Sequence, residues 1–294
     1  MSRYGAVVLL GFGGPESPEE IRPFLDRVLE GKRIPPERYE AVVSHYEQMP
    51  GGKSPFNELT ARQAEGLERE LRARGIELPV RVAYKNSAPF EDDVVRELSG
   101  TGTLLGIILA VFQSPASWQK YQTLPDARYV DPYFDHPLLI EANAQRVRGA
   151  IERLGQSSFE GTALIFTAHS IPQAMADASP YPAQFARTAE LVARAAGARE
   201  WEIAYQSRSG SPADPWLDPD VRDVLAELPQ RGIGNAIVAP IGFLCDHVEV
   251  LYDLDIDAAE VARDSGVRMQ RAAAINDHPL FIRMLADLVQ QCLA

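Results

Sequence analysis

The sequence predicts an α/β protein built from two similar halves, each a parallel sheet flanked by helices. Four short apolar runs have the length and composition of buried strands, and they cover residues 6–10, 106–112, 163–167 and 236–241. Longer amphipathic stretches of helical period lie between them, such as residues 56–74 and 139–154. Strands that alternate with helices in this way are typical of parallel sheets.

The two halves resemble each other in sequence. Residues 82–89 (VAYKNSAP) parallel residues 203–212 (IAYQSRSGSP), and each segment precedes a helix-like stretch and then another apolar strand. We therefore predict one domain from residues 1–138 with 277–294, a second from 139–276, and a cleft between them. A C-terminal helix over 279–293 is expected to pack on the first domain.

Composition limits the class of protein. The chain has 294 residues, enough for about two domains, and 29 basic against 41 acidic residues give a net charge of −12. That charge argues against nucleic acid and anionic membranes as partners, and favours small molecules or cations. The longest apolar runs fall short of the ~18 residues that a membrane span needs, and the N-terminus lacks a signal-peptide pattern. We expect a cytoplasmic monomer.

Cysteine usage excludes two kinds of site. Cys245 and Cys292 are the only cysteines, which are too few for a disulfide framework or for an iron–sulfur cluster. Any metal ion must therefore be held by nitrogen and oxygen ligands.

His169 is the first candidate for chemistry. It follows the apolar run 163–167, so it lies at the carboxyl end of a predicted parallel strand, where open α/β sheets bind their ligands. An imidazole accepts a proton near neutral pH or coordinates a metal ion. The alternative is a structural histidine.

A stripe of carboxylates follows the run 236–241. If the segment is helical, its acidic residues advance by three or four positions and share one face: Asp246, Glu249, Asp253, Asp257 and Glu260. One interpretation is a capping box formed by Asp246 and Glu249, followed by a solvated face. The other is a path for cations that ends at Glu249, since divalent iron accepts carboxylate ligands. A π-bulge in this helix would change which residues share the face.

Two loops carry further candidates. The turn Gly11-Phe12-Gly13-Gly14-Pro15 either lines a ligand or only connects a strand to a helix, and Glu16 stands where a dinucleotide fingerprint needs its third glycine. Hydroxyl and cationic side chains that could bind a carboxylate-bearing ligand, or could equally be surface residues, are Ser54, Lys85, Ser207 and Arg208.

Several motifs together resemble the ferrochelatase family, which inserts ferrous iron into a porphyrin in haem synthesis. They are TAHSIP at 167–172, YQSR at 205–208 with PWL at 215–217, PIGF at 240–243 continuing to DHVEVLYD at 246–253, LGFGGP at 10–15 and GKSP at 52–55. The resemblance implies two Rossmann-like, chelatase-type domains with the porphyrin in the cleft. It also implies Fe²⁺ as a substrate, with no resident cofactor.

The resemblance assigns roles to the candidate residues. It implies that His169 and Glu249 are catalytic, that they bind metal together with Asp253 and Asp257, and that they confront each other across a gap wide enough for a flat macrocycle. The substrate-binding residues that it implies are Phe12, Ser54, Lys85, Ser207 and Arg208.

The sequence departs from some relatives at four positions. Phe12 replaces a tyrosine near the metal, Leu29 and Glu30 replace an arginine pair, and Phe112 replaces a histidine. The polar segment 38–49 differs from the apolar lip of membrane-associated relatives, which favours coproporphyrin III over protoporphyrin IX as the substrate. Two alternatives stay open: a non-catalytic tetrapyrrole or metal carrier, and a cobalt or nickel chelatase that acts on a sirohydrochlorin-like ring.

Overall fold

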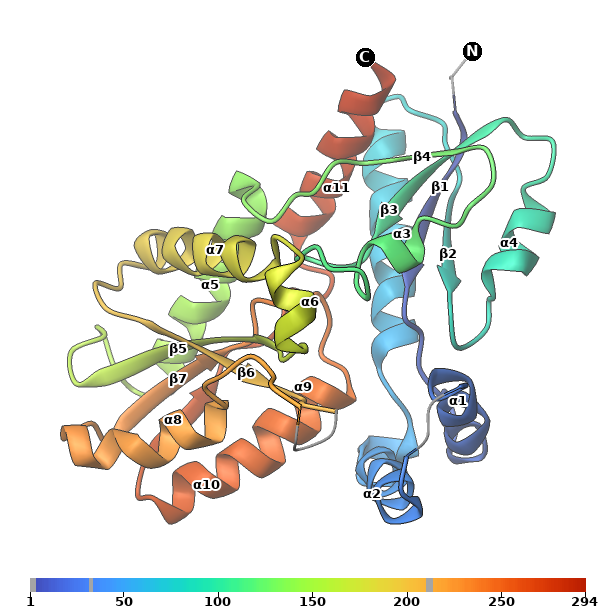
Figure 1. Ribbon diagram of the computed structural model, residues 1–294. Helices are drawn as coiled ribbons and strands as arrows, with labels where there is room; N and C mark the ends of the chain where they lie inside the picture. The colour runs from blue at the N-terminus through green and yellow to red at the C-terminus, as the bar shows by residue number, and fades with distance from the viewer. Residues whose placement is uncertain (1–3, 32–33, 210–213) are drawn as a thin grey trace. The chain divides into compact units, whose positions relative to one another are not determined.

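A computed structural model describes residues 4–31, 34–209 and 214–294 of the protein (Figure 1). The chain forms two compact units. The first comprises Met1–Leu109, Tyr121–Asp131 and Leu285–Ala294, and the second comprises Ala110–Lys120 and Pro132–Met284. Set against the predicted domains, residues 110–120, 132–138 and 277–284 belong with the second unit rather than the first.

Each unit contains one four-stranded parallel sheet. The first consists of β1 (Tyr4–Gly11), β2 (Val80–Tyr84), β3 (Thr103–Ile108) and β4 (Ala127–Tyr129), in the order β2-β1-β3-β4. The second consists of β5 (Thr162–His169), β6 (Glu202–Gln206), β7 (Asn235–Ala239) and β8 (Arg268–Arg271), in the order β6-β5-β7-β8. Both sheets thus have the same topology, and the predicted fold class of two similar α/β halves is confirmed.

The helices of the first unit follow the predicted pattern. They are η1 (Pro18–Glu20), α1 (Ile21–Val28), α2 (Pro36–Glu47), η2 (Pro50–Gly52), α3 (Phe56–Ala73) and α4 (Glu91–Glu97). α3 was predicted over 56–74, and its buried face, which includes Leu67 and Leu71, packs on β1 and β2. Apolar burial of this kind is the main source of stability for an amphipathic helix.

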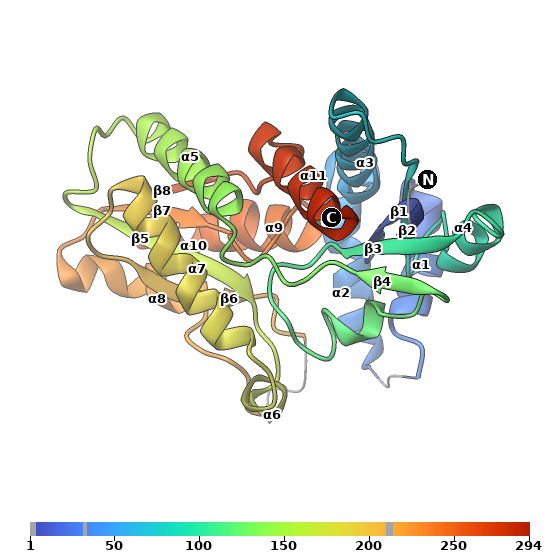
Figure 2. The same cartoon turned by 90° about the horizontal axis from the view of Figure 1, so that it is seen from above.

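The helices of the second unit cover both faces of its sheet. They are α5 (Pro137–Arg153), α6 (Gln173–Asp177), α7 (Tyr181–Ala196), α8 (Val221–Glu227), η4 (Leu228–Arg231), α9 (Val248–Tyr252), η5 (Asp253–Ala258) and α10 (Ala259–Asp264). The short η3 (Gln119–Tyr121) lies where the chain passes from the second unit to the first in sequence. α5 and α7 lie on one face, and α8 and α10 lie on the other (Figures 1 and 2). None of the described helices is long and apolar enough to span a membrane.

The C-terminal helix α11 (Pro279–Leu293) has the predicted bounds. Its last part, from Leu285, belongs to the first unit. There Arg74 Nη1, just after α3, lies 2.6 Å from Asp287 Oδ1 on α11. The expected packing of this helix on the first half is therefore present.

A close approach of two backbones prepares the site in the second unit. Gly242, in the loop after β7, donates its N–H to the Thr167 carbonyl of β5 over 3.0 Å. A Cβ atom at position 242 would lie 2.6 Å from the Cβ of Ala168, which is closer than carbon atoms pack. Only glycine lets this loop pass directly behind the end of β5, and the loop leads into α9.

Candidate functional site

His169 and Glu249 form a pair at the carboxyl end of β5. His169 is the last residue of β5, Glu249 lies in the first turn of α9, and the distance from His169 Nε2 to Glu249 Oε1 is 3.6 Å. The two side chains remain 30% and 41% exposed, so a ligand can reach them. The expectation that they confront each other across a gap for a macrocycle is wrong, because this is an ion-pair distance and no ring fits between the two groups.

Main-chain contacts fix the orientation of the imidazole. His169 Nδ1 lies 2.5 Å from the Ser170 carbonyl oxygen, and the Tyr181 hydroxyl donates to the His169 carbonyl over 2.9 Å. Since a carbonyl only accepts, Nδ1 must carry the proton. The neutral ring therefore presents the lone pair of Nε2 on the side where Glu249 lies.

The pair tunes the protonation of both members. Burial opposes the charged form of His169, but the Glu249 carboxylate outweighs it and raises the pKa of the imidazole above its ordinary value of 6.5. Burial likewise opposes ionisation of Glu249, yet the charge and hydrogen bonding of His169 lower its pKa to about 2. Glu249 is thus an anion at neutral pH, beside an imidazole whose pKa is raised above its ordinary value.

Asp253 is the second carboxylate of the site. Burial raises its pKa to about 7, although the Ser207 hydroxyl, which donates to its Oδ2, acts in the opposite direction. Ser207 has a φ of +61°, a left-handed conformation that serine rarely adopts and that is typical of functional loops. Asp257, one turn further on, is partly buried and supports the charge of Arg222.

The acidic residues after β7 do not lie on one regular α-helix. The helix changes from α to π at Asp253, so η5 alters the spacing of the following residues. The N-cap is His247, whose Nδ1 accepts from the Glu249 N–H over 3.2 Å, and burial lowers the pKa of this histidine. The alternative interpretation, a capping box formed by Asp246 and Glu249, is therefore wrong.

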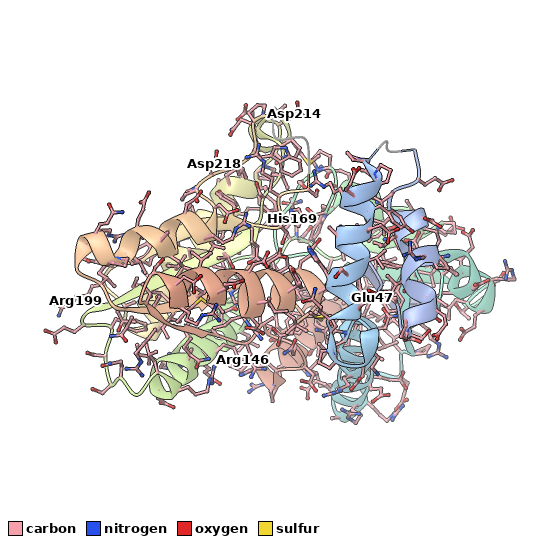
Figure 3. All side chains as sticks on the ribbon, turned by 90° about the horizontal axis from the view of Figure 1, so that it is seen from below. Glu47, Arg146, His169, Arg199, Asp214 and Asp218 are labelled. Atoms are coloured by element: carbon pink, nitrogen blue, oxygen red, sulfur yellow. The ribbon has the colours of Figure 1, made fainter. Side chains whose placement is uncertain are left out.

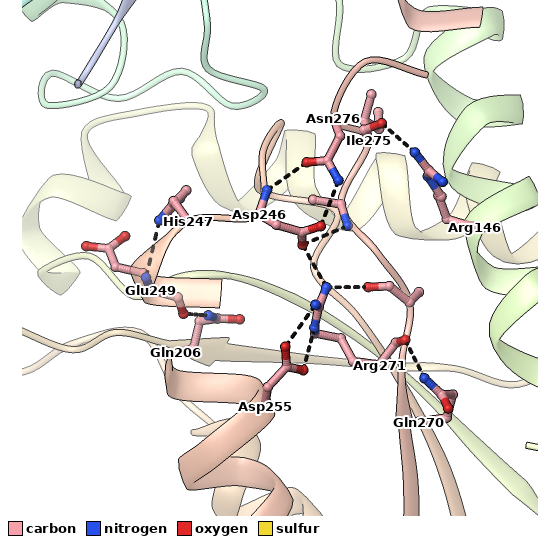
Figure 4. Close-up of polar contacts among 12 residues, drawn as sticks. Arg146, Gln206, Asp246, His247, Glu249, Asp255, Gln270, Arg271, Ile275 and Asn276 are labelled. Carbon is pink, nitrogen blue, oxygen red and sulfur yellow. Dashed lines mark hydrogen bonds and ion pairs between the residues drawn. The ribbon is translucent and has the colours of Figure 1, made fainter. Parts of the chain in front are cut away.

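Asp246 belongs instead to an ion-pair network with Arg271 (Figure 4). Arg271 Nη1 lies 2.7 Å from Asp246 Oδ1, and its Nε lies 2.6 Å from Asp255 Oδ1. Asn276 pairs with Asp246 in both directions, since it accepts from the Asp246 N–H over 2.8 Å and donates to Oδ2 over 2.7 Å. Arg271 and Asp246 are only 14% and 16% exposed. The network joins β8, the loop before α9, and the π-helix.

The remaining predicted residues of this unit lie in the loop after β6. Arg208 is exposed and donates from Nη2 to the Asp214 carbonyl over 2.8 Å. A small cavity of about 200 Å³ lies beside it, lined among others by Ser170, Tyr205 and Arg222. Figure 3 shows His169 in the same unit as Asp214 and Asp218 of this loop. Phe112 is buried and packs its ring 5.5 Å from that of Tyr181.

Three predicted substrate-binding residues belong to the first unit. Phe12 is 37% exposed and directs its ring edge toward Phe24. Ser54 is buried, accepts from the Phe56 N–H and packs on Gly14. Lys85 binds Glu91 and donates to Thr123 over 2.7 Å, so a ligand carboxylate would have to compete with Glu91 for its ammonium group.

Leu29 and Glu30, which stand where some relatives have an arginine pair, differ in exposure. Leu29 is the C-cap of α1 and half-buried, and Glu30 is exposed. Neither side chain offers a positive charge to a carboxylate. The first unit does place Arg27 nearby, and its Nε donates to the Asn86 carbonyl over 2.8 Å.

Among residues 4–31, 34–209 and 214–294, no group of three or more His, Cys, Asp and Glu side chains is arranged to hold a metal ion. The His169–Glu249 pair supplies one nitrogen and one carboxylate ligand.

The sequence did not reveal three residues of the site. Tyr181 and Arg271 lie far along the chain from their partners and carry no local motif. Gln206 lies inside the YQSR motif, but only its neighbours were assigned a role. Its Nε2 donates to the Glu249 carbonyl over 2.6 Å.

The Arg271 network yields a stability prediction. Arg271→Met leaves Asp246 without its cation in a nearly buried position, so we expect the free energy of unfolding to fall by about 3 kcal/mol. Urea denaturation followed by circular dichroism measures the loss. Arg231→Met is the matched control, because Arg231 forms an exposed pair with Glu202 at 2.8 Å that contributes at most about 1 kcal/mol. Equal losses in the two variants would contradict the prediction.

Known proteins share this architecture and much of this sequence. A solved structure of SirB from Bacillus subtilis with Fe³⁺ has a similar fold, with a TM-score of 0.58 and 13% identity over 98% of this chain and 95% of that chain. A protein of Rhodopirellula baltica named ferrochelatase is 38% identical over 98% of this chain and 86% of its own length. A coproporphyrin III ferrochelatase of Mycolicibacterium vanbaalenii is 39% identical over 97% of this chain and 89% of its own length.

The family model for ferrochelatase matches residues 4–293. This match includes both units, the His169–Glu249 pair and the Phe12 turn. The chain therefore belongs to the ferrochelatase family.

Proposed function

We propose that this protein inserts Fe²⁺ into coproporphyrin III to give coproheme, a lyase-type metal insertion in haem synthesis. The observation that carries the proposal is the accessible His169–Glu249 pair, 3.6 Å apart at the carboxyl end of β5, in a chain of the ferrochelatase family. The porphyrin and Fe²⁺ are both substrates in this proposal, and no resident cofactor takes part.

The pair suits the two tasks of the reaction. Pyrrole N–H groups are very weak acids, so metal insertion needs a base at the macrocycle and a group that attracts the cation. The neutral His169 presents Nε2 as the base, because its Nδ1 proton is held by the Ser170 carbonyl. Glu249, ionised at neutral pH, attracts Fe²⁺ and stabilises the imidazolium that forms. Asp253 provides a further proton acceptor near pH 7 and, with Asp257, an acidic approach for the metal.

The choice of coproporphyrin III rests on two observations. Relatives at 37–39% identity carry the name coproporphyrin III ferrochelatase. Helix α2, which covers most of the segment 38–49, is largely polar and buries only Val43 and Tyr46.

A tetracarboxylate substrate needs cations and hydroxyls, for which we propose Arg208, Ser207, Ser54 and Lys85, with Phe12 against the ring. The cleft between the halves, the monomeric state and the cytoplasmic location are parts of the same proposal.

A direct comparison of substrates tests the proposal. We expect the purified protein to insert Fe²⁺ into coproporphyrin III under anaerobic conditions. Its kcat/KM is expected to be at least about tenfold higher than for protoporphyrin IX, a difference that corresponds to roughly 1.4 kcal/mol in transition-state binding. Absorbance of the metallated product measures both rates. A preference for protoporphyrin IX would overturn the substrate assignment. If the protein metallated neither porphyrin but inserted cobalt or nickel into a sirohydrochlorin, the alternative of a cobalt or nickel chelatase would be supported.

Replacing the base separates an enzyme from a carrier. His169→Ala removes the proton acceptor, so we expect kcat to fall by at least about 100-fold, the usual range for loss of a general base. Binding of coproporphyrin, followed by fluorescence quenching, is expected to persist. His136→Ala is the matched control, because His136 caps α5 and lies outside the pair. Equal turnover in the wild type and in His169→Ala would favour a non-catalytic carrier.

The rate is expected to fall at acid pH. Only the neutral imidazole accepts a proton, and Glu249 raises the pKa of His169, so activity is lost as the pH falls through a value above 6.5. A pH–rate profile of kcat measures this limb. Asp253→Asn removes the titration of Asp253 and one negative charge near His169, so it should retain an acid limb that lies at a lower pH. An absent limb in a folded protein would contradict the role of His169.

A further inference from the structure

Gln206 is hydrogen-bonded to the main chain beside His169 and to the main chain of Glu249, through different groups. It is the last residue of β6, is paired in register with His169 of β5, and is only 2% exposed. Its carbonyl accepts from the Ser170 N–H over 2.8 Å, and its side-chain Nε2 donates to the Glu249 carbonyl over 2.6 Å (Figure 4). Ser170 in turn holds the imidazole Nδ1 of His169.

The Glu249 carbonyl lies where the helix changes its hydrogen-bond pattern. In a regular α-helix it would accept from the N–H of Asp253, four residues on. The Asp253 N–H donates instead to the Val250 carbonyl, just before the π-helix begins. Gln206 thus provides a donor from the sheet at the point where the helix departs from the regular ladder.

The side-chain amide of Gln206 leaves one buried oxygen without a hydrogen bond in the described part of the chain. With Nε2 directed to Glu249, its Oε1 is buried and accepts no hydrogen bond within the described part of the chain. A buried acceptor in this state lowers stability, so its presence needs an explanation other than packing. A residue selected only for packing would be apolar here, as neighbouring Ala204 on the same face of β6 is.

We propose that Gln206 is a positioning residue for metal insertion, which sets the distance between the imidazole of His169 and the carboxylate of Glu249. The inference rests on the proposed function. Through its main chain it fixes the strand end that carries His169, and through its side chain it fixes the first turn of α9 that carries Glu249. Gln206 itself touches neither reacting group.

Two variants test the proposal. Gln206→Met keeps the volume and removes the donor, and Gln206→Asn keeps an amide but withdraws it from the Glu249 carbonyl. We expect kcat for metal insertion to fall about 10- to 100-fold in both, with KM for the porphyrin changed less than about twofold, because geometry of the pair is lost while binding is not. Asn143→Leu is the matched control, since Asn143 is also a buried amide that donates to a main-chain carbonyl, that of Leu139, over 3.1 Å.

A second measurement keeps this test independent of the function. The ring ¹⁵N resonances of His169, assigned by their loss in His169→Ala, are expected to shift in Gln206→Met and to stay unchanged in Asn143→Leu. Unchanged resonances and kcat in folded Gln206 variants, or an equal loss of kcat in Asn143→Leu, would overturn the proposal. A wild type that metallates no porphyrin would instead overturn the proposed function, and the resonances would still report on positioning.

Discussion

The parallel pairing of β5 with β6 and β7 is the constraint on which the site depends. Because all three strands end at the same edge, His169, Gln206 and the loop that leads to Glu249 converge there without any special connection. The close passage of Gly242 behind Ala168 shortens the path from β7 to α9. This arrangement of the backbone brings the side chains of His169 and Glu249 to an ion-pair distance of 3.6 Å.

Electrostatics at this edge divides the carboxylates into two kinds. Glu249 and Asp253 titrate at very different pH, because Glu249 faces the imidazole of His169 and Asp253 is desolvated by burial beside the Ser207 hydroxyl. Asp246 and Asp255, only a few residues away, are neutralised by Arg271. The acidic segment thus contains two carboxylates that pair with Arg271 and two that face His169 and Ser207, and the π-helix holds members of both groups.

The sequence predicted the central strands and the long helices well because their apolar periodicity is strong. It did not predict β8, whose residues 268–271 are mostly polar and lie at the edge of the sheet, where alternation is weak. The site residues likewise divide into those that a local sequence pattern indicates and those that it does not. His169 and Glu249 were predicted from strand ends and a family resemblance, whereas Arg271 and Tyr181 are set by folding between distant segments and leave no local pattern. Gln206 was visible in its motif, but its role depends on a helix irregularity that only coordinates reveal.

The shared topology of the two sheets places different residues at equivalent strand ends. The last residue pair between the central strand and its neighbour is His169 with Gln206 in the second sheet, and Gly11 with Tyr84 in the first. The end of the second sheet thus carries the His169–Glu249 pair, while the equivalent end of the first holds the Tyr84 ring beside Gly11. That corner of the first sheet is also closely packed, since a Cβ atom at position 11 would lie 3.0 Å from the Phe56 ring and 3.3 Å from the Tyr84 ring, so the two halves are constrained at the same place in the topology for different reasons.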